Sequence, residues 1–220
     1  MRRKYFELSV GKIFFFALLI LLSSCKDKLS KETVVYTNSF DNNNLTNIDN
    51  GVISLYNGSL VLGQYNNSGF IITVNNLPKH DLITISFDLF IHGSWDGNKQ
   101  APDGPDIWQM SVNKNTYINT TFSNLACQPN NFCSPQAYPF NYPNNYNNPK
   151  TGAYRTDLPG VCNNEDPGGT TQYKITKTFT HSNSVLTLQC LDKLVQTNST
   201  DPKCDESWSV DNINIKAITL

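Results

Sequence analysis

The stretch Leu82–Ile91, LITISFDLFI, decides the fold class of this chain. Apolar side chains recur in it at every second position, while Thr84, Ser86 and Asp88 occupy the positions between them. A period of two is that of an extended backbone, whose successive side chains point to opposite faces. The stretch therefore predicts a β-strand with one face on a hydrophobic core.

Comparable short runs lie on both sides of this strand, separated by Asn, Gly and Pro residues, and no window keeps a helical period. The further strands that we expect are 34–40, 52–56, 59–62, 70–74, 107–113, 117–122, 172–180, 185–191 and 208–218. About ten short strands joined by turn residues favour two packed antiparallel sheets. The predicted fold is an all-β, two-sheet antiparallel β-sandwich.

The last predicted strand carries a carboxylate in an unusual position. Asp211 shares its alternation with Ile213 and Ile215, so it is expected to face the core, where an unpaired charge is costly. Asp41 follows the first predicted strand, and first and last strands of a closed sandwich usually lie close together. Asp41 and Asp211 are therefore candidate ligands of one calcium ion, which prefers oxygen ligands. The alternative is that Asp211 accepts backbone N–H groups at the start of its strand.

A second, weaker metal candidate is the segment SWDGNKQAPDGPDI, residues 94–107. It places Asp96, Asp103 and Asp106 in a turn-rich loop, where three carboxylates can converge on a cation. Their spacing does not match an EF-hand, and a solvated turn is the alternative.

The N-terminal residues have the three parts of a secretory signal. Arg2, Arg3 and Lys4 precede an apolar run that ends at Leu22-Ser23-Ser24-Cys25. This ending resembles the lipobox of bacterial lipoproteins, which implies lipidation of Cys25; an ordinary signal peptide is the alternative. We expect a signal peptide over 1–24, a tether over 25–33 and the sandwich over 34–220. The location expected is extracytoplasmic, lipid-anchored to the outer membrane or cell surface.

Composition excludes several functions. Removing residues 1–24 takes away four of 17 basic and one of 18 acidic residues, leaving 13 and 17, a net charge of −4. Nucleic-acid binding needs a basic face, so it is not expected. No Ser-His-Asp order, HExxH pattern or phosphate-binding glycine loop is present, which favours a protein that is not an enzyme.

Five cysteines follow Cys25, and in an oxidising compartment they are expected to form disulfides. The preferred pairs are Cys127–Cys133 and Cys190–Cys204, because each closes a short loop. Cys162 is then unpaired, although its exchange into the first pair is an open alternative.

Residues 123–169 contain seven of the eleven prolines, many asparagines and no predicted strand. A long loop of this kind is usually functional or disordered. Aromatic rings can stack on sugars while Asn amides bind hydroxyls. The alternative is that these rings form a minor core at the edge of the sandwich. The candidate ligand-binding residues are Tyr138, Phe140, Tyr142, Tyr146 and Trp95.

An ordered set of motifs supports the fold. Ser94-Trp95-Asp96-Gly97-Asn98, Gly104-Pro105-Asp106, Thr120-Thr121-Phe122-Ser123-Asn124 and Glu206-Ser207-Trp208-Ser209-Val210-Asp211-Asn212 follow one another. This order resembles a family of secreted or surface-anchored bacterial jelly-roll proteins without a settled activity, over residues 40–220. The ending Trp208–Ile213 is also similar to the last strand of carbohydrate-binding and adhesion jelly rolls. That similarity implies a structural calcium at Asp211 and Asp41, although a glutamate is more usual at the Asp41 position.

Together these observations predict a membrane-anchored surface lipoprotein with a non-catalytic, calcium-stabilised binding or adhesion module. Its candidate partners are a glycan or another surface protein. A polysaccharide-degrading enzyme, hydrolase or lyase, and a structural envelope protein are the alternatives.

Overall fold

The computed structural model describes residues 31–125, 127, 133–162, 167–195 and 200–220. The predicted signal peptide, Cys25 and residues 26–30 of the predicted tether lie outside these residues. Within the described part of the chain, no helix is long and apolar enough to span a membrane.

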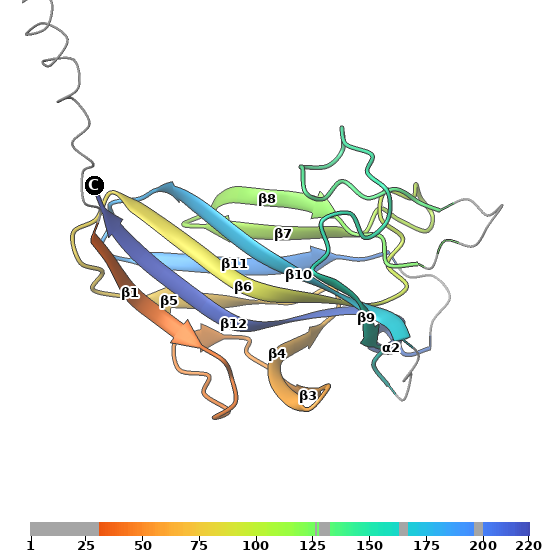
Figure 1. Cartoon of the computed structure of the whole chain (residues 1–220), viewed down its shortest axis with the longest axis horizontal. Helices are drawn as coiled ribbons and strands as arrows, with labels where there is room; N and C mark the ends of the chain where they lie inside the picture. The colour runs from red at the N-terminus through yellow and green to blue at the C-terminus, as the bar shows by residue number, and fades with distance from the viewer. Residues whose placement is uncertain (1–30, 126, 128–132, 163–166, 196–199) are drawn as a thin grey trace, which may run out of the picture. The chain divides into compact units, whose positions relative to one another are not determined.

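The larger of two antiparallel sheets has seven strands in the order β3-β4-β12-β6-β10-β9, with β1 also paired to β12 (Figure 1). The expectation that the first and last strands are neighbours is therefore confirmed. The seven strands are β1 (Lys31–Asn38), β3 (Ile53–Tyr56), β4 (Ser59–Tyr65), β6 (Leu82–Gly93), β9 (Arg155–Pro159), β10 (Pro167–Thr180) and β12 (Glu206–Thr219).

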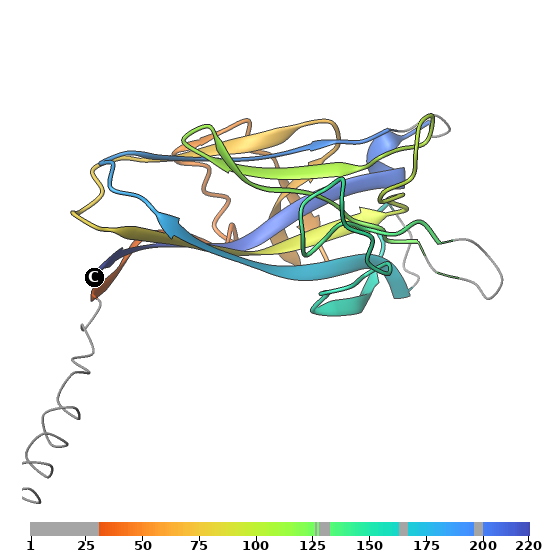
Figure 2. The same cartoon turned by 90° about the horizontal axis from the view of Figure 1, so that it is seen from above.

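The smaller sheet has five strands in the order β2-β5-β11-β7-β8. It lies over the larger sheet as the second layer of the sandwich (Figure 2). These strands are β2 (Ile48–Asp49), β5 (Gly69–Val74), β7 (Ile107–Val112), β8 (Asn115–Thr121) and β11 (Leu186–Lys193). One short helix, α2 (Pro202–Asp205), directly precedes β12. The predicted two-sheet antiparallel β-sandwich is confirmed; β2, β9 and α2 are elements that the sequence did not predict.

The core between the sheets is built from the alternating residues that the sequence indicated. The odd-numbered residues of β6 from Ile83 to Ile91 are all buried, and they pack with inward residues of β12, β5, β7 and β11. Three tryptophans, Trp95, Trp108 and Trp208, are fully buried at one end of this core. Burying large aromatic surfaces is among the strongest contributions to such a core.

A second, smaller core covers part of the outer face of the larger sheet. The even-numbered Phe90 and His92 of β6 are also buried, beneath Tyr56, Leu158 and Val161. His92 lies between two hydroxyls, with Nδ1 2.9 Å from Thr170 Oγ1 and Nε2 2.8 Å from Ser209 Oγ. Both faces of β6 are therefore covered at this end.

The disulfides differ from the prediction in one pair. Cys127–Cys133 is present as expected, but the second bond joins Cys162 to Cys204. Among the cysteines that the structure describes, Cys190 is the free thiol, and it is buried. The prediction failed because Cys190 lies on the inward face of β11, where it pairs in register with Phe70 and Met110 inside the core, while Cys204 is bonded to Cys162.

Candidate functional site

The acidic loop, residues 94–106, brings two of its three predicted carboxylates together. Carboxylate oxygens of Asp96 and Asp106 and of Glu206 lie within 4.8 Å of one another. Asp106 and Glu206 stand two residues before the inward-facing Trp108 and Trp208, and they are 0% and 3% exposed. The cluster therefore closes the end of the sandwich from both sheets.

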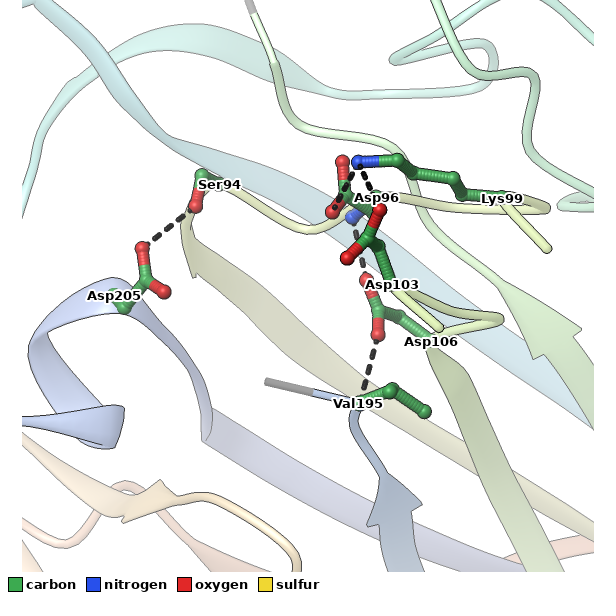
Figure 3. Close-up of polar contacts among 7 residues, drawn as sticks. All are labelled: Ser94, Asp96, Lys99, Asp103, Asp106, Val195 and Asp205. Carbon is green, nitrogen blue, oxygen red and sulfur yellow. Dashed lines mark hydrogen bonds and ion pairs between the residues drawn. The ribbon is translucent and has the colours of Figure 1, made fainter. Parts of the chain in front are cut away.

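Asp103 does not join this cluster. Lys99 lies between the carboxylates, with Nζ 3.3 Å from Asp96 Oδ2 and 3.4 Å from Asp103 Oδ2 (Figure 3). Asp103 is thus on the exposed side of a lysine that supplies part of the positive charge the loop needs. The predicted convergence of all three aspartates is therefore wrong for Asp103.

Backbone groups hold Asp106 in place. Its Oδ2 accepts the N–H of Asp96 and its Oδ1 accepts the N–H of Val195 at 3.2 Å (Figure 3). The pKa of Asp106 is raised to about 7, mainly by burial and also by the charge of Asp96, while the two N–H groups and the charge of Lys99 oppose the shift. Burial likewise raises the pKa of Asp96, against the opposing effect of Lys99.

Two close backbone contacts position the acidic loop. Gly93 (φ 80°) lies opposite Glu206, and a Cβ there would be 1.7 Å from the carbonyl oxygen of Asp205. Gly97 (φ 63°) approaches Pro135, whose carbonyl oxygen would be 2.4 Å from an added Cβ. Glycine is needed at both points because it tolerates positive φ and has no side chain to collide.

Asp211 lies on the face of the sheet opposite to the predicted one. Asp211 pairs with Asp88 in register, but Asn214 pairs with Ser86, so three residues of β12 span two of β6. Asn212 has a φ of 53° at this bulge. One extra residue reverses the alternation, so Trp208 and Ile213 both face the core while Asp211 faces outward beside Asp88.

Asp41, Asp88 and Asp211 form an acidic group on this outer face. Burial raises the pKa of Asp211 to about 6, with additional contributions from the charges of Asp41 and Asp88. Lys174 Nζ lies 3.0 Å from Asp88 Oδ1, and Asn212 donates to Asp88 Oδ2 at 2.9 Å. Asp41 and Asp211 are thus close enough for their charges to interact. The calcium site at these two residues stays a prediction.

The predicted ligand-binding aromatics separate into two groups. Phe140 and Tyr146 are 58% and 74% exposed, and Tyr142 is half-buried. Trp95 is fully buried and donates to the carbonyl oxygen of Ser207 at 3.0 Å, so its predicted ligand role is wrong. Tyr138 packs on Phe122 and Tyr173, with ring centroids 5.0 Å away in each case, and belongs to the core.

Phe140 and Tyr146 project from the Asn-rich loop, residues 134–154, which a single buried amide organises. Gln136 Oε1 accepts the N–H groups of Ser123 (3.2 Å) and Lys150 (2.9 Å) and the hydroxyl of Tyr173 (3.3 Å). Its Nε2 donates to the carbonyl oxygens of Tyr138 (3.2 Å) and Thr151 (2.9 Å). The loop is therefore fixed in one conformation without regular secondary structure.

Other amides fasten this loop to its surroundings. Asn98 Nδ2 donates to Asn145 O at 2.8 Å, and Asn147 Nδ2 donates to the carbonyl oxygens of Ala137 and Tyr138 at 3.0 and 3.1 Å. The N–H of Tyr142 bonds Asn119 O of β8 at 2.8 Å. Much of the asparagine content thus serves internal hydrogen bonding, which is how irregular backbone becomes ordered.

Sequence reasoning missed Glu206, Asp88 and Gln136. The signal for Glu206 was its alternation with Trp208 in the ESW motif, and the signal for Asp88 was its place in the strongest strand. Gln136 gave no signal, because its partners are backbone groups from distant parts of the chain.

No family model matches the sequence, and no curated protein matches it. Among solved structures the chain is similar to a family 35 carbohydrate-binding module from Clostridium thermocellum, with 11% identity, coverage of 84% of this chain and 97% of that one, and a TM-score of 0.35.

A CBM6 module from Cellvibrio mixtus lichenase 5A, in complex with cellotriose, shares 11% identity over 83% and 97% of the two chains, with a TM-score of 0.32. The CBM22-2 xylan-binding domain of Paenibacillus barcinonensis Xyn10C shares 11% identity over 83% and 99%, with a TM-score of 0.34. The ligands in these names belong to those proteins.

Proposed function

We propose that this protein is a surface lipoprotein, anchored through Cys25, whose β-sandwich is a non-catalytic glycan-binding module. The observation that carries the binding proposal is the exposure of Phe140 and Tyr146 on a loop fixed by Gln136. Exposed aromatic rings on a rigid support lose little conformational entropy when they bind, so they are effective stacking surfaces.

The Asn-rich loop also provides polar groups beside these rings. Asn144 and Asn148 are exposed next to Tyr146. Amides of this kind can donate to and accept from sugar hydroxyls, while the rings contact the apolar faces of sugars. The mature net charge of −4 favours neutral glycans over strongly acidic ones.

A glycan array tests this proposal. The wild-type protein should bind a subset of glycans without releasing products, and the double variant Phe140→Ala/Tyr146→Ala should lose that binding. Leu55, 73% exposed on β3, offers a matched control, since Leu55→Ala removes an exposed apolar side chain elsewhere. Equal binding by the double variant and the wild type would refute the assignment to this loop.

The anchor is tested separately. Cells grown with a labelled fatty acid should incorporate label into the wild-type protein, and Cys25→Ser should abolish both labelling and membrane retention. Surface proteolysis of intact cells then reports whether the sandwich faces outward.

Calcium is the proposed structural ion, with Asp41 and Asp211 as one ligand pair and Asp96 and Asp106, joined by Glu206, as the other candidate. Both sets offer only oxygen ligands, which suits calcium. EDTA should lower the melting temperature, and Asp211→Asn or Asp106→Asn should remove that effect at the site concerned. An unchanged melting curve with no calcium by elemental analysis would refute the proposal.

The alternative of a polysaccharide-degrading enzyme has one observation in its favour, the raised pKa of Asp106 beside Glu206, since a neutral acid and a carboxylate are the groups of glycoside hydrolysis. Asp106 is, however, 0% exposed. Release of reducing ends that Asp106→Asn abolishes would favour this alternative over binding alone.

A further inference from the structure

Two adjoining hollows lie on the outer face of the five-stranded sheet, away from the Asn-rich loop. One has a volume of about 520 Å³ and the other about 280 Å³, and both are lined by Ile71 and Gln189. These two residues are direct cross-strand partners on β5 and β11. The hollows therefore adjoin at this pair, and we call the two together the outer groove.

One end of the outer groove is a rigid turn. Asn113 and Lys114 have φ values of 48° and 70°, the conformation of a two-residue hairpin turn between β7 and β8. Asn113 Oδ1 accepts the N–H of Thr187 at 2.8 Å, and its Nδ2 lies 3.0 Å from His181 Nε2. The turn is thus tied to β11 and to the loop before it.

The other end is equally fixed. Asn67 donates to and accepts from the backbone of Leu194 at 3.0 and 2.8 Å. The Asp192 carboxylate accepts the N–H groups of Asn67 and Ser68 at 2.6 and 2.9 Å. Hydrogen bonds within the chain hold both ends in place, which reduces the entropic cost of binding a ligand.

The lining indicates an uncharged, hydroxyl-rich ligand. Among the described residues that line the two hollows, the charged side chains are Lys114, at one end, and Asp192, whose carboxylate already accepts backbone N–H groups. Between the ends, no described residue hydrogen-bonds the side chains of Thr187 or Gln189. Ile71 and Val185 add apolar surface beside these polar groups.

We infer that the outer groove is a second glycan-binding site, for a neutral oligosaccharide lying along β5 and β11. Gln189 and Thr187 hydrogen-bond its hydroxyls, and Ile71 and Val185 contact its apolar faces. The combined volume falls in the range of small-ligand sites. The inference rests on the proposed function for its ligand class but uses residues of a different sheet face.

The test is calorimetric titration of the full-length protein in detergent with cellohexaose, xylohexaose and mannohexaose, and with a galacturonic acid hexamer as the charged comparison. The double variant Thr187→Val/Gln189→Leu, which removes both proposed hydrogen-bonding side chains at similar volume, should weaken binding at this site by about tenfold or more, and Gln189→Glu by roughly three- to tenfold. Lys193→Gln, on the same outward row of β11 but outside both hollows, should match the wild type. Circular dichroism checks that each variant is folded.

The two sites are separable. Neutral hexaose binding that survives Phe140→Ala/Tyr146→Ala and is lost in Thr187→Val/Gln189→Leu supports the outer groove and assigns no hexaose binding to the loop. Binding unaffected by Thr187→Val/Gln189→Leu, or no neutral hexaose bound by the wild type, overturns the inference, while array binding that depends on Phe140 and Tyr146 leaves the proposed function standing. A concentration-dependent dimer that Thr187→Val/Gln189→Leu weakens, without sugar binding, would assign the groove to a second copy and overturn the inference.

Discussion

Replacing Gln136 by Leu removes one side chain that is 0% exposed and makes five hydrogen bonds. Leucine has a similar volume, so the change leaves no large cavity and isolates the hydrogen-bonding role. The side chain is the common partner of the Asn-rich loop, the strand end at Ser123 and Tyr173 of β10. Its loss should therefore destabilise both the loop and the sandwich.

The magnitude follows from how many of its partners remain buried. If the loop opens, its own N–H and carbonyl groups regain water, but Ser123 (0% exposed) and Tyr173 (1%) stay inside. Two unsatisfied buried groups cost about 2 kcal/mol, and five cost about 5 kcal/mol if the loop stays closed. We expect Gln136→Leu to lower the free energy of unfolding by about 2 to 5 kcal/mol.

Urea denaturation followed by tryptophan fluorescence measures this change, because all three tryptophans are fully buried. Gln109→Leu is the matched control, since Gln109 lies on an outer face and its side chain makes one hydrogen bond, 2.7 Å to Asn119. Gln109→Leu should lower the free energy of unfolding by about 1 kcal/mol or less. A loss below about 1 kcal/mol for Gln136→Leu, with an unchanged m-value, would refute the hub role of this amide.

Three further outcomes are expected. Burial lowers the pKa of His92 to about 3, so the contribution of His92 to stability should be full above pH 6.5 and fall by up to about 1.4 kcal/mol per pH unit as the pH drops toward 3. The raised pKa values of Asp106 and Asp211 act in the opposite direction, so the slope should be read from the difference in unfolding free energy between the wild type and His92→Gln in pH-dependent urea melts. Replacing both Cys162 and Cys204 by Ser removes a bond between residues 42 positions apart, so it should lower the free energy of unfolding by about 4 kcal/mol. A decrease under about 1 kcal/mol in thermal or urea unfolding would contradict the pairing. In the lipidated protein, whose Cys25 thiol is blocked, Cys190 should be unreactive to a thiol reagent in the native state and react once per chain after denaturation without reductant, because burial both shields it and raises its pKa.

The sequence predicted the sandwich because residues 82–91 alternate strictly and the short apolar runs around them are separated by turn residues. The odd-numbered residues of β6 face the core as their period requires. The burial of Phe90 and His92 on the other face was not predictable, because the segments that cover them, β3 and the residues around Leu158, are distant from β6 in the sequence.

Alternation failed at Asp211, and the reason is local. A single extra residue at Asn212 shifts the phase of β12, and the sequence alone gives no measure of where two strands fall out of step. A count of positions back from Ile213 crosses the bulge and assigns Asp211 to the wrong face. Counting forward from Trp208 assigns it correctly.

In the candidate sites, too, contacts along the chain could be predicted and contacts across the fold could not. Local spacing indicated Asp96 and Asp106, which lie in one loop, but Glu206 joins them only through the pairing of β12 with β6. Short loop closure favoured Cys190–Cys204, yet side-chain direction on β11 excludes that bond. Spacing in the sequence predicts contacts between residues close along the chain, but it does not predict contacts between distant strands.

The bonds between the Asn-rich loop and β8 affect how copies of this protein behave beside one another. An uncovered strand at the border of a sheet offers free N–H and carbonyl groups to neighbouring chains. Tyr142 and Tyr138 occupy two such carbonyls of β8 with their N–H groups, at 2.8 and 3.2 Å, and the side chain of Asn141 accepts the N–H of Asn119 at 3.1 Å. The loop thereby serves as a barrier to intermolecular sheet extension, so a loop-shortened variant should self-associate even where its fold survives.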